Sequence, residues 1–250
     1  MRTDSTTSTF RLLQGLLLLA AGLPVTGWSA PVTLCGPTIC YEYDNAQSSI
    51  ALFGTPSLLG GSDTLQFTPD KFDADTDPAN DADPVNPIPW MQTAVFNFSR
   101  VYSTNGGEIA SIVVTESGYY QILNNGTVNV NLRLQSVDQV NDGSWPGGVP
   151  EVTVGQFNWD TSVPTGLSLD EWTLAGTLTP AATFNDAATV VNLQIQNTLQ
   201  ALTSGGYAFI AKKLTLTTTT TVVPVPAAVW LFGSAVGLLG WLRRRAIQPA

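Results

Sequence analysis

Histidine is absent from this chain of 250 residues, and basic residues are scarce. Without histidine, Ser-His-Asp and Cys-His catalytic arrangements and histidine-based zinc sites are excluded, and the commonest general base is missing. Between residues 31 and 221, five Lys and Arg side chains stand against 18 Asp and Glu, which gives a net charge of −13. Such an acidic surface repels nucleic acid and anionic lipid headgroups. It suits cations, neutral glycans or simple solubility.

Cysteine is nearly absent as well, with only Cys35 and Cys40 in the sequence CGPTIC. The pair lacks the C-x-x-C spacing of thioredoxin-like redox motifs. In an oxidising compartment, a close and even pair of this kind predicts a disulfide. The disulfide would hold down an N-terminal stretch that otherwise tends to be disordered.

Residues for catalysis are few. No glycine-rich phosphate-binding loop occurs, so paired carboxylates remain as the groups that could drive a reaction such as glycoside hydrolysis. Asp170 and Glu171 are adjacent, but neighbours on a strand point to opposite faces. We expect four other acids to be solvated surface groups: Glu42, Glu108, Glu116 and Glu151. The sequence therefore predicts no catalytic residue and no enzyme activity.

One long uncharged run is present near the C-terminus. Residues 222–242 read VVPVPAAVWLFGSAVGLLGWL, and Arg243, Arg244 and Arg245 follow at once. Because proline limits where a helix starts, we expect a single transmembrane helix over residues 227–242, about 24 Å long. Trp230 would lie near the membrane interface, and the arginines on the cytoplasmic side, ahead of a short tail at 246–250.

The pattern over residues 222–245 resembles the PEP-CTERM sorting signal, in which a Pro-Glu-Pro-like motif precedes a transmembrane helix and a basic end. Here Val225 stands where that family usually has Glu. The resemblance implies recognition by an exosortase, an integral-membrane cysteine transpeptidase, with cleavage near residues 224–227. It also implies a bacterium that makes exopolysaccharide, a possible partner. The alternative is an ordinary stop-transfer anchor. The residues of the motif are Val223, Pro224, Val225, Pro226, Ala227, Trp230, Arg243, Arg244 and Arg245.

The N-terminus has the pattern of a secretory signal peptide over residues 1–30. Arg2 and Arg11 accompany a short apolar run at 12–23, LLQGLLLLAAGL, which is too short to span a membrane comfortably. We expect signal peptidase to cut between Gly27 and Ala30; an uncleaved signal anchor is the alternative. Together the two ends place the body outside the cytoplasmic membrane, first anchored and then at the cell surface or extracellular after processing.

The body over residues 31–216 reads as an all-β, antiparallel β-sandwich or jelly-roll-like fold, because short runs with period-two alternation are separated by turn residues. Asn125-Gly126 predicts a hairpin, and Ser117-Gly118 predicts a break between strands. Residues 186–202 fit a helix or a strand, and we favour a strand because Asn and Thr are poor helix formers. The other expected strands lie around 94–98 and at 109–115, 119–123, 127–134, 152–159, 172–178 and 207–217.

Residues 217–223 begin with five consecutive threonines. They form either a stalk next to the membrane or the end of the last strand. We assign them as a Thr-rich stalk.

An acidic, proline-rich loop occupies residues 70–89. Its alternating carboxylates resemble a calcium loop, but Pro78 and Pro84 stand where an EF-hand has Gly and Glu. It is either a solvated loop or a Ca²⁺ site of another kind, and no other cofactor is expected. The candidate ligands are Asp73, Asp75, Asp77, Asp81 and Asp83.

Trp145 lies in the loop sequence DGSWPGG and is a candidate for stacking on a sugar. The first hypothesis for the chain is a non-enzymatic, exported protein of the extracellular matrix. A lectin-like glycan-binding module, with or without Ca²⁺, is the alternative, and a histidine-free glycosidase is the least favoured.

Overall fold

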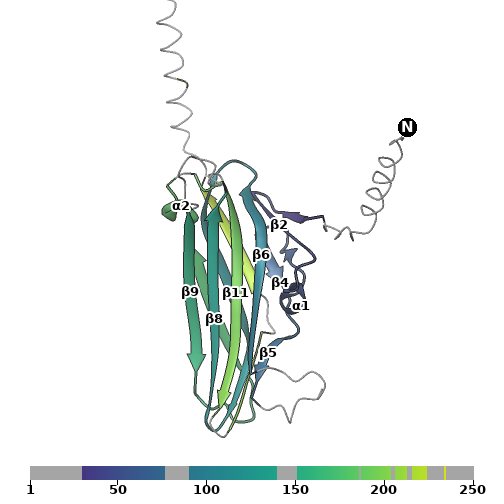
Figure 1. Ribbon diagram of the computed structural model, residues 1–250, viewed down its shortest axis with the longest axis vertical. Coiled ribbons are helices and arrows are strands. Elements are labelled where there is room, and N and C mark those ends of the chain that lie inside the picture. The colour runs from purple at the N-terminus through teal and green to yellow at the C-terminus, as the bar shows by residue number, and fades with distance from the viewer. Residues whose placement is uncertain are drawn as a thin grey trace, which may run out of the picture. The chain divides into compact units, whose positions relative to one another are not determined.

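The body is an antiparallel sandwich of two β-sheets in a computed structural model (Figure 1). The structure describes residues 30–76, 90–139, 151–185, 187–203, 206–212, 216–223 and 234. Two four-residue helices, α1 (Ile50–Phe53) and α2 (Pro180–Thr183), accompany the strands. The predicted all-β sandwich is therefore confirmed.

The first sheet has the order β1-β2-β6-β11-β8-β9. Its four longest strands, β6, β11, β8 and β9, lie side by side in Figure 1. The strand bounds are β1 (Val32–Cys35), β2 (Ile39–Tyr43), β6 (Met91–Ser103), β8 (Gly126–Asp138), β9 (Val152–Thr161) and β11 (Val190–Thr203).

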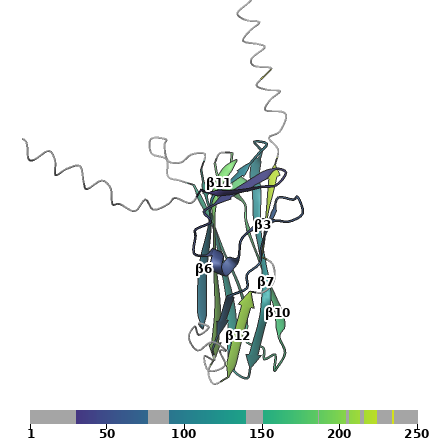
Figure 2. The same ribbon diagram turned by 90° about the vertical axis from the view of Figure 1, so that its right-hand side faces the viewer.

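The second sheet is built around β7, with the order β3-β4-β13-β7-β12-β5 and with β10 also paired to β7. Figure 2 shows β12, β7 and β10 on this side of the sandwich. The strand bounds are β3 (Ser57–Leu58), β4 (Thr64–Phe67), β5 (Phe72–Asp75), β7 (Glu108–Leu123), β10 (Asp170–Leu178), β12 (Tyr207–Lys212) and β13 (Leu216–Val223).

Two short strands share one edge of β7. Ala211 of β12 pairs with Tyr119, and Thr217 of β13 pairs with Thr115, while β10 pairs with both of these β7 residues from the other side. The single strand predicted at 207–217 is therefore two strands in tandem. The assignment of 217–223 as a stalk is wrong, because the threonine run pairs with β7 and β4.

The core lies between the sheets and follows from alternation of buried and less buried residues along the long strands, which is unbroken in β8. Every second residue of β8 is buried, as the period-two pattern at 127–134 predicts. One part of the core is aromatic, with ring centroids about 5–6 Å apart and tilted or edge-on contacts, the arrangement that aromatic quadrupoles favour. These buried rings belong to Tyr41, Tyr43, Phe53, Phe67, Phe72, Phe96 and Phe98.

Two turn predictions are wrong. Asn125-Gly126 does not form a hairpin, because β7 and β8, which it joins, belong to different sheets. The turn has a left-handed residue, but it is Asn124, with φ of 63°. Ser117-Gly118 does not interrupt a strand either, since both residues lie inside the 16-residue β7.

Two other predictions are confirmed. The ambiguous segment at 186–202 contains the strand β11, which pairs with β6 on one side and β8 on the other. Cys35 and Cys40 form a disulfide at the end of the β1–β2 pair, with their Cα atoms 4.1 Å apart.

Among the residues that the structure describes, no helix is long and apolar enough to cross a membrane. The predicted signal peptide at 1–30, apart from Ala30, and the predicted transmembrane helix at 227–242, apart from Ser234, lie outside the described residues.

Candidate functional site

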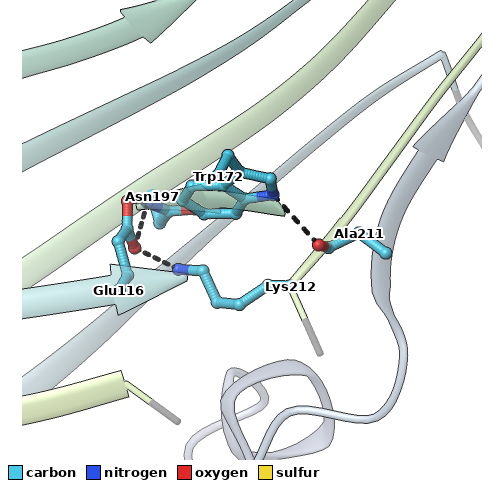
Figure 3. Close-up of polar contacts among 5 residues, drawn as sticks. All are labelled: Glu116, Trp172, Asn197, Ala211 and Lys212. Atoms are coloured by element: carbon cyan, nitrogen blue, oxygen red, sulfur yellow. Dashed lines mark hydrogen bonds and ion pairs between the residues drawn. The ribbon is translucent and has the colours of Figure 1, made fainter. Parts of the chain in front are cut away.

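Three polar side chains meet in the middle of the core: Glu116, Asn197 and Lys212 (Figure 3). Each has an exposed fraction of 0%. Asn197 Nδ2 donates to both carboxylate oxygens of Glu116 at 2.7 Å, and Lys212 Nζ forms an ion pair with Glu116 Oε2. The amine and the carboxamide therefore contact the same carboxylate oxygen.

Each member of this buried triad occupies an inward position on its strand. On β7, Glu116 falls between Val114 and Gly118 in the series that faces the core. Asn197 takes the same place on β11, and Lys212 ends the inward series of β12. Since β11 belongs to the first sheet and the other two strands to the second, the triad bridges the two layers.

The surroundings of the triad are apolar and aromatic. The ammonium of Lys212 lies 5.3 Å from the ring centroid of Phe53 and 5.0 Å from that of Phe72, within the range of cation–π attraction. Burial lowers the pKa of the Lys212 amine, while the adjacent Glu116 carboxylate partly offsets this effect. Asn197 Oδ1 is buried without a hydrogen-bond partner.

The backbone approaches closely beside the triad at Gly118. A Cβ atom added there would lie 1.9 Å from the carbonyl oxygen of Ala211 and 2.8 Å from Trp172 Nε1. Trp172 Nε1 donates a hydrogen bond to that same carbonyl at 3.2 Å, so the buried indole links β10 to β12 across β7 (Figure 3). Glycine is required in the strand because any side chain would occupy this space.

The expectation that Glu116 is a solvated surface acid is wrong. Glu116 is two and four residues from Val114 and Ile112, which are buried, so the alternation of the strand could have shown that it points inward. Asn197 is likewise two residues from the buried Ile195 and Leu199. A carboxylate and an amine with no exposed surface cannot meet an external substrate. Any chemistry at the triad must be among its own members.

A second feature is an open groove of about 650 Å³ at the end of the sandwich where β7, β9 and β11 finish, the lower end in Figure 1. At one side of the groove, Thr203 Oγ1 donates a hydrogen bond to the carbonyl oxygen of Asn125 at 2.8 Å. Amide and hydroxyl side chains dominate the lining, which consists of Asn124, Asn125, Gly126, Thr127, Ser162, Pro164, Leu202 and Thr203.

Apolar side chains are exposed around this groove. Leu167, at the tip of the β9–β10 loop, is 90% exposed, and Val163 is 64% exposed. The loop is nonetheless held in place, because Gln121 Nε2 donates to the carbonyl of Gly166 and Ile122 N donates to Thr165 Oγ1. The groove and the loop together form a fixed surface with both polar and apolar groups.

The predicted Ca²⁺ ligands are only partly described. Asp73 and Asp75 lie on β5, where Asp75 accepts a hydrogen bond from Tyr207 Oη at 3.2 Å. Asp77, Asp81 and Asp83 lie outside the described residues, as does Trp145. Within the described part of the chain, no three His, Cys, Asp or Glu side chains are grouped as metal ligands.

The predicted sorting motif begins at the end of the last strand. Val223 is the final residue of β13 and pairs with Glu108. The other motif residues lie outside the described part of the chain: Pro224, Val225, Pro226, Ala227, Trp230, Arg243, Arg244 and Arg245.

Four other acids that the sequence analysis considered lie at or near the surface. Asp170 and Glu171 are exposed on β10. Glu42 is 3.9 Å from Arg100, and Glu151 accepts hydrogen bonds from Asn185. None of these four acids forms a hydrogen bond with another carboxylate.

Comparison with protein families and with curated proteins gives no match. Among solved structures, one similar chain is described as "Structural basis for the promiscuous specificity of the carbohydrate-binding modules from the beta-sandwich super family". It is 13% identical, with 77% of this chain and 75% of that chain covered, and the TM-score is 0.17. A likeness of this size assigns no function.

Proposed function

We propose that this protein is exported, is processed at its C-terminus by an exosortase, and serves as a non-enzymatic component of the cell surface or extracellular matrix. The observation that carries the proposal is the C-terminal pattern of a Pro-x-Pro motif, an uncharged span and three arginines. The N-terminal run at 12–23 supplies the matching export signal. Before processing, the helix at 227–242 would hold the chain in the membrane.

The described body agrees with this proposal in two respects. β13 ends at Val223, directly before Pro224, so a cut near residues 224–227 would leave the sandwich whole. The disulfide between Cys35 and Cys40 suits an oxidising, extracytoplasmic compartment.

The proposal predicts the ends of the mature chain. In a host with its exosortase, C-terminal peptide mapping should find an end near residues 224–227. In a strain without the enzyme, the chain should still end at Ala250. Full-length chain in both strains would make the segment at 227–242 a permanent anchor and would refute processing.

A second candidate function is binding of a neutral glycan in the groove. The lining amides and hydroxyls can exchange hydrogen bonds with sugar hydroxyls, while Leu202 and Pro164 supply apolar contact. The groove lies at the end of β7 opposite to Glu108, and Glu108 pairs with the last residue of β13. The groove would therefore lie about 50 Å along the 16-residue β7 from Val223, the last residue of β13.

Glycan arrays on the purified mature protein test this function. Ser162→Trp fills the groove and should lower affinity for any bound glycan by tenfold or more, since the site would be blocked. Val152→Trp is the matched control, because Val152 is exposed at the first residue of β9, whereas Ser162 directly follows the last residue of that strand. Equal glycan binding by both variants would exclude the groove as the glycan site. Loss of glycan binding on addition of a chelator would instead indicate a Ca²⁺-dependent site in the acidic loop at 70–89.

A further inference from the structure

The buried triad contains the three groups that are needed to make an amide bond between side chains. Lys212 supplies a primary amine, Asn197 a carboxamide, and Glu116 a carboxyl group that contacts both. Since Nζ and Nδ2 both bond to Oε2, they lie no more than about two hydrogen-bond lengths apart. All three side chains are excluded from water.

We propose that Lys212 Nζ and Asn197 Cγ condense to an intramolecular isopeptide bond, with Glu116 carrying the protons. The bond would join β12 in the second sheet to β11 in the first sheet. It is a modification of the folded body, independent of how the two ends of the chain are processed.

The reaction is balanced without any co-reactant. Lys212 first passes a proton to the Glu116 carboxylate, which leaves a neutral amine. The lone pair of Nζ then attacks Cγ of Asn197, and Glu116 takes a proton from Nζ and delivers one to Nδ2. The Cγ–Nδ2 bond breaks and releases ammonia, which takes the second proton that Glu116 holds and leaves as ammonium, so Glu116 is again a carboxylate.

The surroundings favour this reaction over a simple ion pair. Burial against Phe53 and Phe72 lowers the pKa of the Lys212 amine, which raises the fraction that can act as a nucleophile. The sandwich holds amine and amide together, so the step needs no encounter between separate molecules. Exclusion of water also removes the nucleophile that would otherwise hydrolyse the amide.

The state of Asn197 points the same way. Its carbonyl oxygen Oδ1 is buried with no hydrogen-bond partner, an arrangement that costs free energy in a stable network. A half-turn of the carboxamide would place Oδ1 beside Glu116, where a protonated carboxyl could donate to it. That hydrogen bond would polarise the carbonyl for attack by the amine.

The mass of the purified, folded protein tests the proposal directly. After reduction of the Cys35–Cys40 disulfide, the wild-type chain should be lighter than its sequence by about 17 Da, the mass of ammonia. Chymotrypsin cuts after Leu and aromatic residues such as Leu199, Leu202, Tyr207 and Phe209, which separate the two partners. The digest should therefore contain one branched peptide that joins Asn197 to Lys212.

Variants identify the groups involved. Asn197→Ala and Glu116→Ala should both restore the full sequence mass. Asn131→Ala should keep the deficit of about 17 Da, because Asn131 is a half-buried carboxamide on the outer face of the neighbouring β8 and serves as the matched control. A wild-type chain of full sequence mass with two separate peptides would overturn the proposal, whether or not the variants fold.

Discussion

Glu116→Ala is expected to lower the free energy of unfolding by about 3–5 kcal/mol, because the ammonium of Lys212 would stay buried without its counter-charge. Lys212→Met should have an effect of similar size by leaving the carboxylate of Glu116 unpaired. Urea denaturation followed by tryptophan fluorescence measures both.

The double variant Glu116→Leu/Lys212→Met is the control for this interpretation. It removes both charges, so it should be more stable than Glu116→Ala by about 3 kcal/mol or more. Its free energy of unfolding would remain below that of the wild type if the isopeptide bond forms, since the double variant cannot form that bond. A double variant that is less stable than both single variants would contradict the role of unpaired charge.

The pH dependence of Glu116→Ala has a definite sign. Burial lowers the pKa of Lys212 in the folded state, and loss of Glu116 removes the contact that offsets this effect. The unfolded chain then binds more protons than the folded chain in the pH window between the lowered pKa of the folded state and about 10.4, the usual pKa of lysine. Stability should therefore rise with pH toward that value, relative to the double variant without Lys212.

Gly118→Val is expected to prevent folding, and Gly118→Ala to cost at least about 3 kcal/mol, beyond the usual range for overpacking. The new Cβ would lie 1.9 Å from the Ala211 carbonyl oxygen, which is backbone held between β5 and β7 and cannot rotate away. Differential scanning calorimetry of the purified variants measures the loss.

Ser117→Ala is the matched control for Gly118. Ser117 is the preceding residue on the same strand and faces away from the core, so its variant should melt close to the wild type. A Gly118→Ala variant that melts within a few degrees of the wild type would mean that β12 can move away from β7, and that the close approach is not required.

Sequence alternation predicted which residues face the core but not which strands pair. Along β8 the apolar residues at every second position are enough to fix the buried face. The turn at Asn125-Gly126, by contrast, has the composition of a hairpin, yet it carries the chain from one sheet to the other. Local turn chemistry limits the backbone angles, whereas the sheet that receives the next strand depends on packing of the whole core.

The position of Gly118 shows a second limit. A glycine beside a serine inside an apolar run has the composition of a strand break. It is in fact an interior strand residue, chosen because the Ala211 carbonyl and Trp172 crowd the backbone. Those neighbours are 93 and 54 residues further along the sequence, so no local pattern could show them.

The triad was within reach of sequence analysis only in part. Each of its members shares the phase of an apolar alternation, which marks it as an inward polar residue. Their meeting depends on long-range pairing, because Asn197 is 81 residues from Glu116 and Lys212 is 96 residues from it. All three residues could have been found by expecting each inward polar residue of a strand to contact another inward polar residue.

Intact mass of the protein recovered from outside the cells of its own host tests most directly whether the chain is exported and processed. We expect a chain that begins between residues 28 and 31 and ends near residues 224–227. A mass that includes residues 1–30 and extends to Ala250 would contradict both export with cleavage and processing at the C-terminus.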